Sequence, residues 1–297
     1  MGGLSSFPGL QQVLVVRVNL PLSRIVALVW FRIDVAVQKS CLVPPKRFIV
    51  PPMRELGAGI VVIGNEILSG KTVDSNSAFL ARELRQLGVT LKRIAVIPDD
   101  VDDIATTVRE FHQKFDLVFT SGGVGPTHDD ITIEGVARGL GCRVVRHPLL
   151  ENKIHEYLNG KTPNSAHLKM AEIPEGAELL IHDQLRFPTI KIENIYILPG
   201  IPEILQQKFH ALKERFAVDP YFLKIIYTTE VESTIASYLN DTLKVYPDLL
   251  LGSYPKIGNS EYRVKLTLES KNKDYVERAF AHLLQLLPTG CVVKTEG

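Results

Sequence analysis

From Leu56 onward the chain alternates apolar runs of strand length with amphipathic stretches of helix length, and this alternation limits its possible folds more than any other feature. The run at residues 59–63 (GIVVI) has no polar alternation, which is typical of a strand buried on both faces. Similar runs follow at residues 92–97 and 116–120, with helical patterns between them. Because parallel strands need helical crossovers, this order predicts an α/β fold with a largely parallel sheet covered by helices.

End signals in the same region predict three helices, each marked by a polar capping residue, a closing glycine or both. The predicted helices begin after Asp74 or Ser75, at Asp100 and at residue 131, and the first ends at Gly88 and the third at Gly141. One more strand of the sheet is predicted at residues 192–198.

The remaining chain predicts a smaller α+β module with strands at residues 224–229 and 262–268 and helices at residues 233–243 and 275–287. A chain of 297 residues has room for one large or two ordinary domains. We therefore expect three parts, a leader over residues 1–52, an α/β domain over residues 53–218 and the small module over residues 219–297.

The charge balance argues against one class of partner. Acidic and basic side chains nearly cancel, and the formal net charge of +1 gives no overall attraction to nucleic acid or to an anionic membrane. The small module has neither a basic stripe nor a Gly-x-x-Gly loop of the kind that some RNA-binding domains use. We therefore expect a local small-molecule site and no nucleic-acid partner.

Residues 1–52 differ from the rest, because basic side chains outnumber acidic ones and prolines interrupt any helix. The longest uncharged run, residues 1–16, contains Pro8 and falls short of the roughly 20 apolar residues of a membrane helix, so no membrane span is expected. Three interpretations stay open: an organelle transit peptide, a myristoylation pattern that begins at Met1, and a poorly structured extension. We favour the extension, because Met53 stands just before the first strand.

Cysteine usage indicates the compartment. Cys41, Cys142 and Cys291 are too widely separated for a zinc site or a disulfide framework, which is typical of a reduced, intracellular protein. We expect a cytoplasmic location, with the mitochondrial matrix as the alternative if residues 1–52 act as a transit peptide.

Loops at the strand ends carry the candidate chemistry, because ligands of open α/β sheets bind beyond the carboxyl ends of the strands. Each of these loops of the predicted sheet carries an acid, a glycine or both. The loops are Gly64–Gly70 with Glu66, Pro98–Asp100 with Asp99, Ser121–Asp130, and Pro199–Pro202 with Gly200.

The loop after the third strand combines glycines with two aspartates. Gly122, Gly123 and Gly125 let main-chain amides converge on an anion such as phosphate. Asp129 and Asp130 would repel that anion unless a hard divalent cation such as Mg²⁺ binds carboxylate and phosphate oxygens together. We infer a metal-bridged phosphate ester or anhydride, with Asp99, Asp130 and Glu66 as the acidic set. The alternative is that Asp130 only caps a helix and the glycines only form a turn.

Four segments in one order carry a family resemblance: GNEILSGKTVDSN, VIPDD, TSGGVGPTHDD and LPGIPEIL. Together they resemble the molybdopterin-binding (MoCF) fold, in particular the branch shared by bacterial competence/damage-inducible proteins and the amino-terminal region of eukaryotic FAD synthase. The tail LLLGSYPKIGNSEYRVKLTLES resembles the FAD synthase branch more specifically. The resemblance spans residues 57–297 and implies a three-layer, mostly parallel sheet with a smaller KH-like module.

The resemblance implies a role for each matched residue. In this family the glycine-rich loop wraps the phosphate-bearing part of the ligand, and the acids of the matched motifs are implicated in metal and phosphate chemistry in relatives that adenylylate molybdopterin. The residues implied for phosphate and nucleotide binding are Gly122, Gly123, Gly125, Pro126, Thr127, Asp74, Asn76, Pro199 and Gly200. Those implied for catalysis are Asp99, Asp130 and Glu66, with Asp99 and Asp130 as metal ligands. Asn65 stands where relatives commonly carry Asp or Thr, so no acid is available at that position.

The activity that the resemblance implies is divalent-metal-dependent hydrolysis of the FAD pyrophosphate to FMN and AMP. FAD synthesis in this family resides in a separate carboxyl-terminal domain of the 3′-phosphoadenylyl-sulfate reductase type, which is missing from these residues, so we expect no synthase activity from this polypeptide. Mg²⁺ is the expected metal, with Mn²⁺ or Co²⁺ as alternatives. Lys71 or His128 would stabilise charge on the departing phosphate.

The alternative function is a non-catalytic regulatory module that binds molybdopterin or a flavin nucleotide. In both cases the expected partner is a flavin or pterin nucleotide. Relatives of this fold are often oligomers, and a homo-oligomer is therefore an open expectation.

Overall fold

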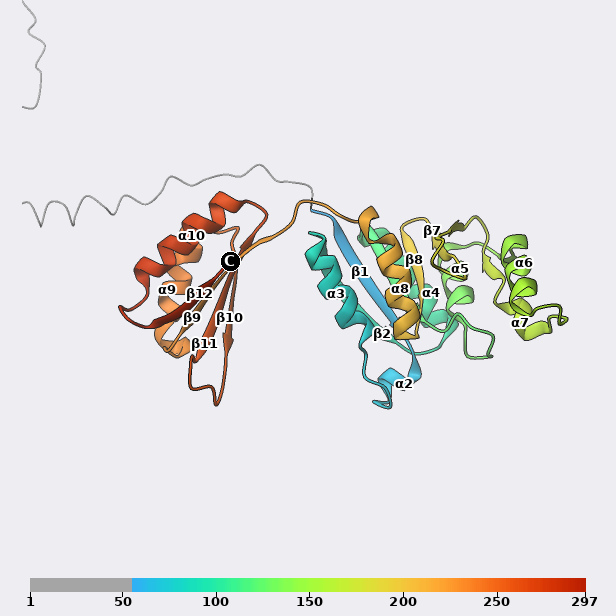
Figure 1. Cartoon of the computed structure of the whole chain (residues 1–297), viewed down its shortest axis with the longest axis horizontal. Helices are drawn as coiled ribbons and strands as arrows, with labels where there is room; N and C mark the ends of the chain where they lie inside the picture. Colours follow the sequence, from blue (N-terminus) through green and yellow to red (C-terminus); the bar gives the residue numbers. More distant parts are fainter. Residues whose placement is uncertain (1–54) are drawn as a thin grey trace, which may run out of the picture. The chain divides into compact units, whose positions relative to one another are not determined.

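The computed structural model describes residues 55–297, which Figure 1 draws in colour. The expectations for residues 1–52 lie outside this described part. A six-stranded sheet in the order β2-β1-β3-β8-β7-β6 organises the larger domain. Its strands are β1 (Gly57–Ile63), β2 (Thr90–Ile97), β3 (Leu117–Gly122), β6 (Glu178–Leu180), β7 (Thr189–Ile192) and β8 (Ile195–Pro199). The first four strands in that order are parallel, whereas β7 runs antiparallel to β8 and β6 runs antiparallel to β7.

The strand predicted at residues 192–198 is present as β8, but it starts at Ile195, and Ile192 belongs to the separate strand β7. The chain reverses at Glu193, whose φ is 51°, and Asn194. The side-chain amide of Asn194 donates to the carbonyl oxygens of His112 (3.1 Å) and Phe115 (2.7 Å). These tertiary hydrogen bonds fix a turn that the apolar pattern does not reveal.

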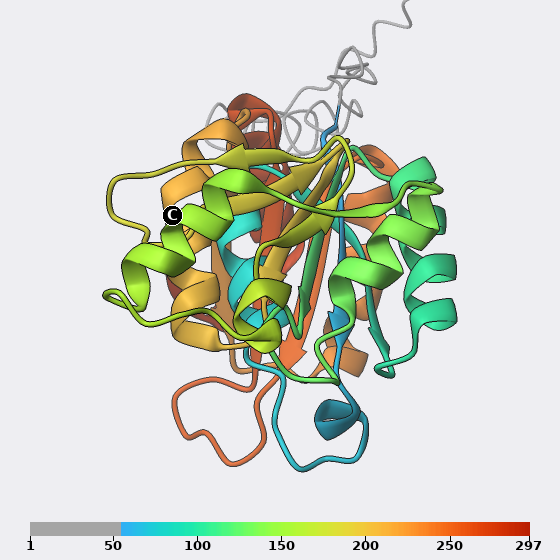
Figure 2. The same cartoon turned by 90° about the vertical axis from the view of Figure 1, so that its right-hand side faces the viewer.

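Helices cover both faces of the sheet, which Figure 2 shows with strands between the two groups. One core contains side chains of β1 and β3 together with α3 (Asn76–Gln86) and α8 (Pro202–Leu212). On the other face, β1 and β3 pack with α4 (Val101–Lys114) and α5 (Thr132–Leu140). Every residue of β1 is buried, which confirms a strand covered on both sides.

The predicted helix ends agree with the structure to within a residue or two. Asp100 caps α4 by accepting hydrogen bonds from the amides of Asp102 (2.9 Å) and Asp103 (3.0 Å). Gly141 ends α5 in the left-handed conformation with a φ of 71°, which glycine adopts without strain.

A subdomain between α5 and β7 escaped the sequence analysis. It consists of the antiparallel pair β4 (Val144–Arg146) and β5 (Glu172–Pro174) with α6 (Pro148–Tyr157) and α7 (Ser165–Lys169), and the one-turn α2 (Asn65–Leu68) was also missed. Leu150, Ile154, Ala171 and Ile173 form its small apolar core. This subdomain supplies one wall of the cleft described below.

The smaller module has its own antiparallel sheet, in the order β10-β11-β9-β12. Its elements are β9 (Phe222–Thr228), α9 (Glu232–Val245), β10 (Leu250–Pro255), β11 (Val264–Ser270), α10 (Lys273–Leu286) and β12 (Val292–Glu296). Ile226, Leu266 and Leu283 are fully buried in its core. The predicted fold class, a mostly parallel α/β sheet with a smaller α+β module, is therefore confirmed. No helix within residues 55–297 combines the length and apolarity that crossing a membrane requires.

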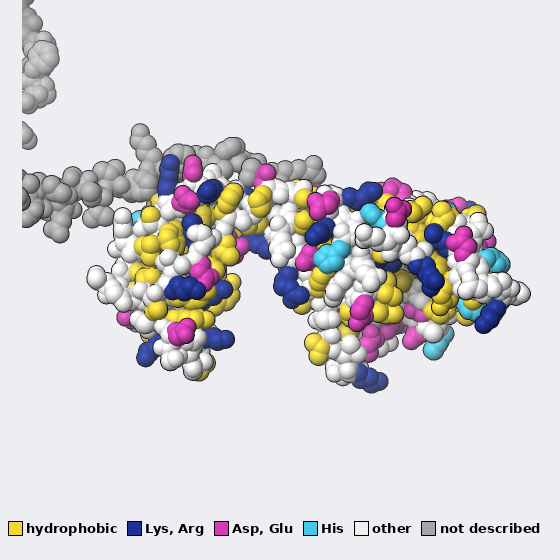
Figure 3. All heavy atoms as spheres, viewed as in Figure 1, with side chains coloured by type: hydrophobic (Ala, Val, Ile, Leu, Met, Phe, Trp, Pro, Cys, Tyr) yellow, Lys and Arg dark blue, Asp and Glu magenta, His cyan; other side chains and the backbone are white. Residues whose placement is uncertain are grey.

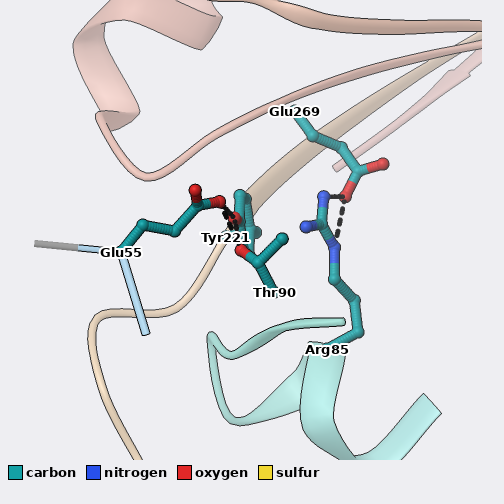
Figure 4. Close-up of polar contacts among 5 residues, drawn as sticks. All are labelled: Glu55, Arg85, Thr90, Tyr221 and Glu269. Atoms are coloured by element: carbon teal, nitrogen blue, oxygen red, sulfur yellow. Dashed lines mark hydrogen bonds and ion pairs between the residues drawn. The ribbon is translucent and has the colours of Figure 1, made fainter. Parts of the chain in front are cut away.

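A group of polar contacts joins the end of α3 to residues 221 and 269 (Figure 4). Arg85 donates from Nε to Oε2 of Glu269 at 3.1 Å, and its guanidinium lies 3.4 Å from the centre of the Tyr221 ring. Glu55 accepts hydrogen bonds from Nζ of Lys92 (2.6 Å) and from the Tyr221 hydroxyl (3.2 Å).

Candidate active site

Four loops at the carboxyl ends of parallel strands form the candidate site. They follow β2, β1, β3 and β8, which are neighbours in that order. Figure 3 shows acidic side chains gathered at the end of the larger domain from which α2 and the loop after it project in Figure 1. A cleft of about 740 Å³ opens there. The sequence-predicted residues that line it are Glu66, Asp99, Gly122, Gly123, Gly125, Pro126, Asp130, Pro199 and Gly200.

The carboxylate of Asp130 lies against the main chain of the glycine-rich loop. Its Oδ2 accepts hydrogen bonds from the amide (2.7 Å) and the hydroxyl (2.5 Å) of Thr127. A Cβ added to Gly123 would stand 2.6 Å from Oδ1 of Asp130, and a Cβ added to Gly125 would stand 2.9 Å from Oδ2. These positions need glycine because the carboxylate occupies the space that a side chain would take.

Asp130 does not act as a helix cap. The N-terminus of α5 receives no side-chain hydrogen bond, and the Asp130 carboxylate turns back to Thr127 instead. The capping role of Asp130 in the alternative interpretation is therefore wrong, whereas its other part, glycines that only form a turn, stays open. The carboxylate is oriented within the loop, at the surface of the cleft.

Asp99 and Glu66 lie at the ends of the two neighbouring strands. Oδ2 of Asp99 accepts a hydrogen bond from the Asn65 amide at 2.8 Å, which ties the loop after β2 to the loop after β1. The Glu66 carboxylate folds over Gly64, where an added Cβ would stand 2.5 Å from Oε1. Both acids face the same cleft.

Asn76 and Asp74 support the site without lining the cleft. The side-chain amide of Asn76 donates to the carbonyl oxygen of Gly200 (2.7 Å) and to Oγ of Ser121 (2.9 Å), which joins the loops after β3 and β8. Asp74 accepts a hydrogen bond from the amide of Ser77 at 3.0 Å in the first turn of α3. Their geometry gives both residues a role in holding the loops.

Three further predicted residues also stand outside the cleft lining. Lys71 is exposed in the loop after α2, and the His128 side chain is 98% exposed. Thr127 reaches the site through its hydrogen bonds to Asp130. The structure thus places neither of the two predicted cations within the cleft.

The sequence analysis missed Lys208, which lines the cleft from α8. Its side chain is only 8% exposed, and Nζ donates to the carbonyl oxygens of Phe187 (2.9 Å) and Pro188 (2.6 Å). Burial lowers the pKa of Lys208 to about 8. The available signal was its position on the buried face of α8 between Leu205 and Leu212, since a lysine on an apolar helical face is uncommon.

Lys169, at the end of α7, was missed as well. Its Nζ donates a hydrogen bond to the carbonyl oxygen of Thr127, across the glycine-rich loop. Together with Asp130 it lines a second pocket of about 280 Å³. The structure therefore holds a cation at the glycine-rich loop, although it is not one of the two that the sequence indicated.

Asp99 and Asp130, which line the same cleft, are the residues that would hold a divalent cation bound together with phosphate. Each carboxylate accepts the hydrogen bonds given above through Oδ2, and Oδ1 of Asp130 lies against Gly123. Mg²⁺ is often held by one or two carboxylates, with water and substrate phosphate completing its shell. Within residues 55–297 there is no group of three or more His, Cys, Asp or Glu side chains that could hold a metal ion. A cation at this site would therefore depend on the ligand.

The fold and the site together define a protein of the molybdopterin-binding class. Residues 59–217 match the family model described as a probable molybdopterin binding domain, and the chain belongs to that family. Residues 220–296 match the model of the FAD synthase middle domain. Both matches agree with the resemblance that the motifs carry.

Individual relatives support the same assignment. A protein of Archaeoglobus fulgidus is 34% identical over 229 residues, which cover 77% of this chain and 96% of that protein. A probable FAD synthase of Caenorhabditis elegans is 32% identical, with 80% of this chain and 50% of the relative covered. The chain thus spans about half the length of the FAD synthase relatives that it matches. The crystal structure of CinA from Thermoplasma acidophilum, titled as a protein of unknown function, is 31% identical with a TM-score of 0.51, covering 55% of this chain and 98% of that one.

Proposed function

We propose that the cleft binds the diphosphate of FAD or a related dinucleotide and hydrolyses it, giving FMN and AMP from FAD. One observation carries the proposal: Glu66, Asp99 and Asp130 line the same cleft as the glycine-rich loop. Loop amides attract a phosphate, whereas carboxylates repel it. A divalent cation between the carboxylates and the phosphate would remove this repulsion. The FAD synthase middle-domain match and the FAD synthase relatives supply FAD as the candidate substrate.

The carboxylates are oriented before a ligand arrives. Thr127 orients Asp130 through two hydrogen bonds, and the Asn65 amide orients Asp99 through one. A cation bound there neutralises charge on the diphosphate and makes a nearby water more acidic. Preorientation of this kind lowers the cost of assembling the reacting groups.

The hydrolytic step needs a base for water and a positive charge for the departing group. The water oxygen bonds to one phosphorus while the bridging phosphorus–oxygen bond breaks, and the two products leave as phosphate monoesters. Glu66, which lines the cleft, accepts the proton of the water. Lys169 lines the neighbouring pocket together with Asp130 and is held at the Thr127 carbonyl oxygen, and from there it stabilises negative charge on the departing phosphate.

The experiment incubates the full chain with FAD and Mg²⁺, Mn²⁺ or Co²⁺ and follows FMN and AMP by chromatography. We expect turnover that a chelator abolishes and that Asp130→Asn lowers by about 10²-fold, since this variant keeps the shape but loses the charge. Asp241→Asn, at an exposed position of α9 paired with Lys244, is the matched control. Turnover that survives both the chelator and Asp130→Asn would contradict the proposal.

A second candidate function is a non-catalytic module that binds a flavin or pterin nucleotide and regulates a synthase. The observation in its favour is that residues 55–297 contain no group of three or more His, Cys, Asp or Glu side chains that could hold a metal ion. Calorimetry with FAD separates the two functions, because tight binding with no FMN or AMP formed favours the module.

A further inference from the structure

The cleft extends along the sheet edge beyond the glycine-rich loop. The parallel strands end there in the order β2, β1, β3, β8, and β7 begins at the same edge because it is antiparallel to β8. Phe187 and Pro188, which immediately precede β7, therefore lie past the end of β8. With adjacent strands about 4.8 Å apart, the Asp99 end and the Phe187 end are on the order of 19 Å apart, with the glycine-rich loop near the middle.

The two ends of the cleft differ in chemistry. The end near β2 and β1 carries Asp99 and Glu66, whereas the end near β7 is lined by apolar side chains. The apolar lining residues are Leu150, Met170, Phe187, Pro188, Ile190 and Ile204. An apolar wall of this kind suits a flat ring system, whereas the acidic end of the cleft does not suit one.

Lys208 is the single basic residue among those that line the cleft, and it stands at the apolar end. Its ammonium carries three N–H donors, of which two go to the carbonyl oxygens of Phe187 and Pro188. Both partners are neutral, so neither of them compensates the positive charge of the ammonium. The third N–H donor is left for a ligand. A ligand oxygen that accepts this donor would reduce the cost of burying the charge.

We propose that Lys208 marks the ring-binding end of the cleft and donates its third N–H to a ring carbonyl oxygen of the ligand. Flavins and pterins share a pyrimidine edge that carries such a carbonyl, whereas adenine has ring-nitrogen acceptors but no carbonyl oxygen. A flavin or pterin ring then occupies the apolar end while the phosphate lies at the glycine-rich loop. The inference rests on the proposed function for the class of ligand, and it adds which half of a dinucleotide enters the apolar end.

The test measures binding of ligands that lack a pyrophosphate bond, so that its outcome does not depend on hydrolysis. The full chain is titrated with riboflavin and neopterin in the presence of a chelator, and with AMP in the presence of Mg²⁺, because the acids beside the glycine-rich loop repel a phosphate when no cation is bound. Lys208→Met keeps an apolar stem and removes the donors, and Lys213→Met, in the 3₁₀ turn at Lys213–Arg215, is the charge-matched control.

We expect Lys208→Met to weaken binding of the ring compound by about tenfold or more, since a hydrogen bond from a charged donor is lost. The Kd for AMP should stay within about twofold of the wild-type value. The ring compound that binds the wild type, riboflavin or neopterin, identifies the kind of ring that the site takes. Ile204→Asn, at a partly exposed position one turn earlier on α8, gives a second variant in case Lys208→Met does not fold. It should weaken ring binding and spare AMP.

Three outcomes would overturn the inference. The first is a wild-type chain that binds neither ring compound, and the second is ring binding that folded Lys208→Met and Ile204→Asn leave unchanged. The third is an equal loss of riboflavin, neopterin and AMP in the variants, which would assign Lys208 to holding the Phe187–Pro188 segment. If FAD hydrolysis is not observed but the ring compound binds as expected, the proposed reaction fails while the ring site stands.

Discussion

Oδ1 of Asp130 lies 2.6 Å from the position that a Cβ on Gly123 would occupy, so the carboxylate fills the place of the missing side chain. Oδ2 of the same carboxylate accepts a hydrogen bond from the amide of Thr127. Glycine at position 123 is therefore required by the acid and not by a positive φ. This relationship links a loop motif of the sequence to the orientation of one candidate catalytic group.

Gly123→Ala should force the Asp130 carboxylate or the loop to move. We expect the free energy of unfolding to fall by about 1–3 kcal/mol, the usual cost of overpacking a tight site, and FAD binding to weaken. Gly200→Ala is the stability control, because its Cβ would meet its nearest neighbour only at 3.7 Å. Urea unfolding of both variants measures the difference, and equal losses would show that the contact with Asp130 is not what excludes a side chain.

Thr127→Val should reduce the proposed hydrolysis without disrupting the fold. The variant keeps the amide donor to Asp130 but loses the hydroxyl donor, so the carboxylate is held by one hydrogen bond. Because the site is open to solvent, we expect a loss near 1 kcal/mol, or about fivefold in the rate of FMN release. Thr127→Ser retains a hydroxyl and should keep most of the rate. A fall of the same size in both variants would remove the hydroxyl from this role.

Glu55 should contribute to stability against acid. Hydrogen bonds from Lys92 and Thr90 lower its pKa from 4.5 to about 2. A carboxyl group whose pKa is lower in the folded state stabilises fully above pH 4.5, and that contribution is lost as the pH falls toward 2. Since the Glu55 side chain is 43% exposed, solvent screening limits the effect to less than about 1 kcal/mol.

Urea unfolding of Glu55→Gln beside the wild type tests this effect. The variant should be less stable at pH 7, and the two proteins should converge as the pH approaches 2. Glu277→Gln, at an exposed position of α10, serves as the control and should follow the wild type. If the difference in free energy of unfolding between wild type and Glu55→Gln stays constant from pH 7 to pH 3, the charge of Glu55 is not its cause.

The features that the sequence predicted depend on signals within a few residues. Asp100 caps α4 through amides two and three residues ahead, and Ile104, Val108 and Phe111 are all buried on the face that their spacing indicated. The unbroken apolar run of β1 likewise marked a strand covered on both faces. Because the strand-end loops follow from strand positions, the convergence of Asp99 and Asp130 at one cleft could also be expected.

The features that the sequence analysis missed depend on contacts between distant segments. Asn76 joins two loops through Gly200, which is 124 residues away. The turn at Asn194 is fixed by hydrogen bonds from its side-chain amide to carbonyl oxygens at the end of α4. The strands on both sides of this turn are apolar, so the sequence pattern did not separate them. The Lys208 ammonium donates to carbonyl oxygens of a segment about 20 residues earlier in the chain. Its place in the cleft therefore depends on how α8 packs against that segment.

The buried ammonium of Lys208 should make stability rise with pH in the alkaline range. Burial lowers its pKa from 10.5 to about 8 in the folded chain. Between these values the unfolded chain binds more protons than the folded chain, so the free energy of unfolding increases with pH from about 8 to about 10.5 and is unaffected by this group below 8. The span between the two pKa values corresponds to at most about 3 kcal/mol.

Lys208→Met lacks this titration, so the comparison isolates it from other groups. The difference in free energy of unfolding between wild type and variant should be constant from pH 6 to pH 8 and should then shift in favour of the wild type up to pH 10. Urea titrations at each pH measure it, with Lys213→Met as the control that loses a lysine without the buried site. A difference that stays constant up to pH 10 would mean that the Lys208 ammonium is well solvated, and its assignment as a desolvated donor at the apolar end of the cleft would have to be withdrawn.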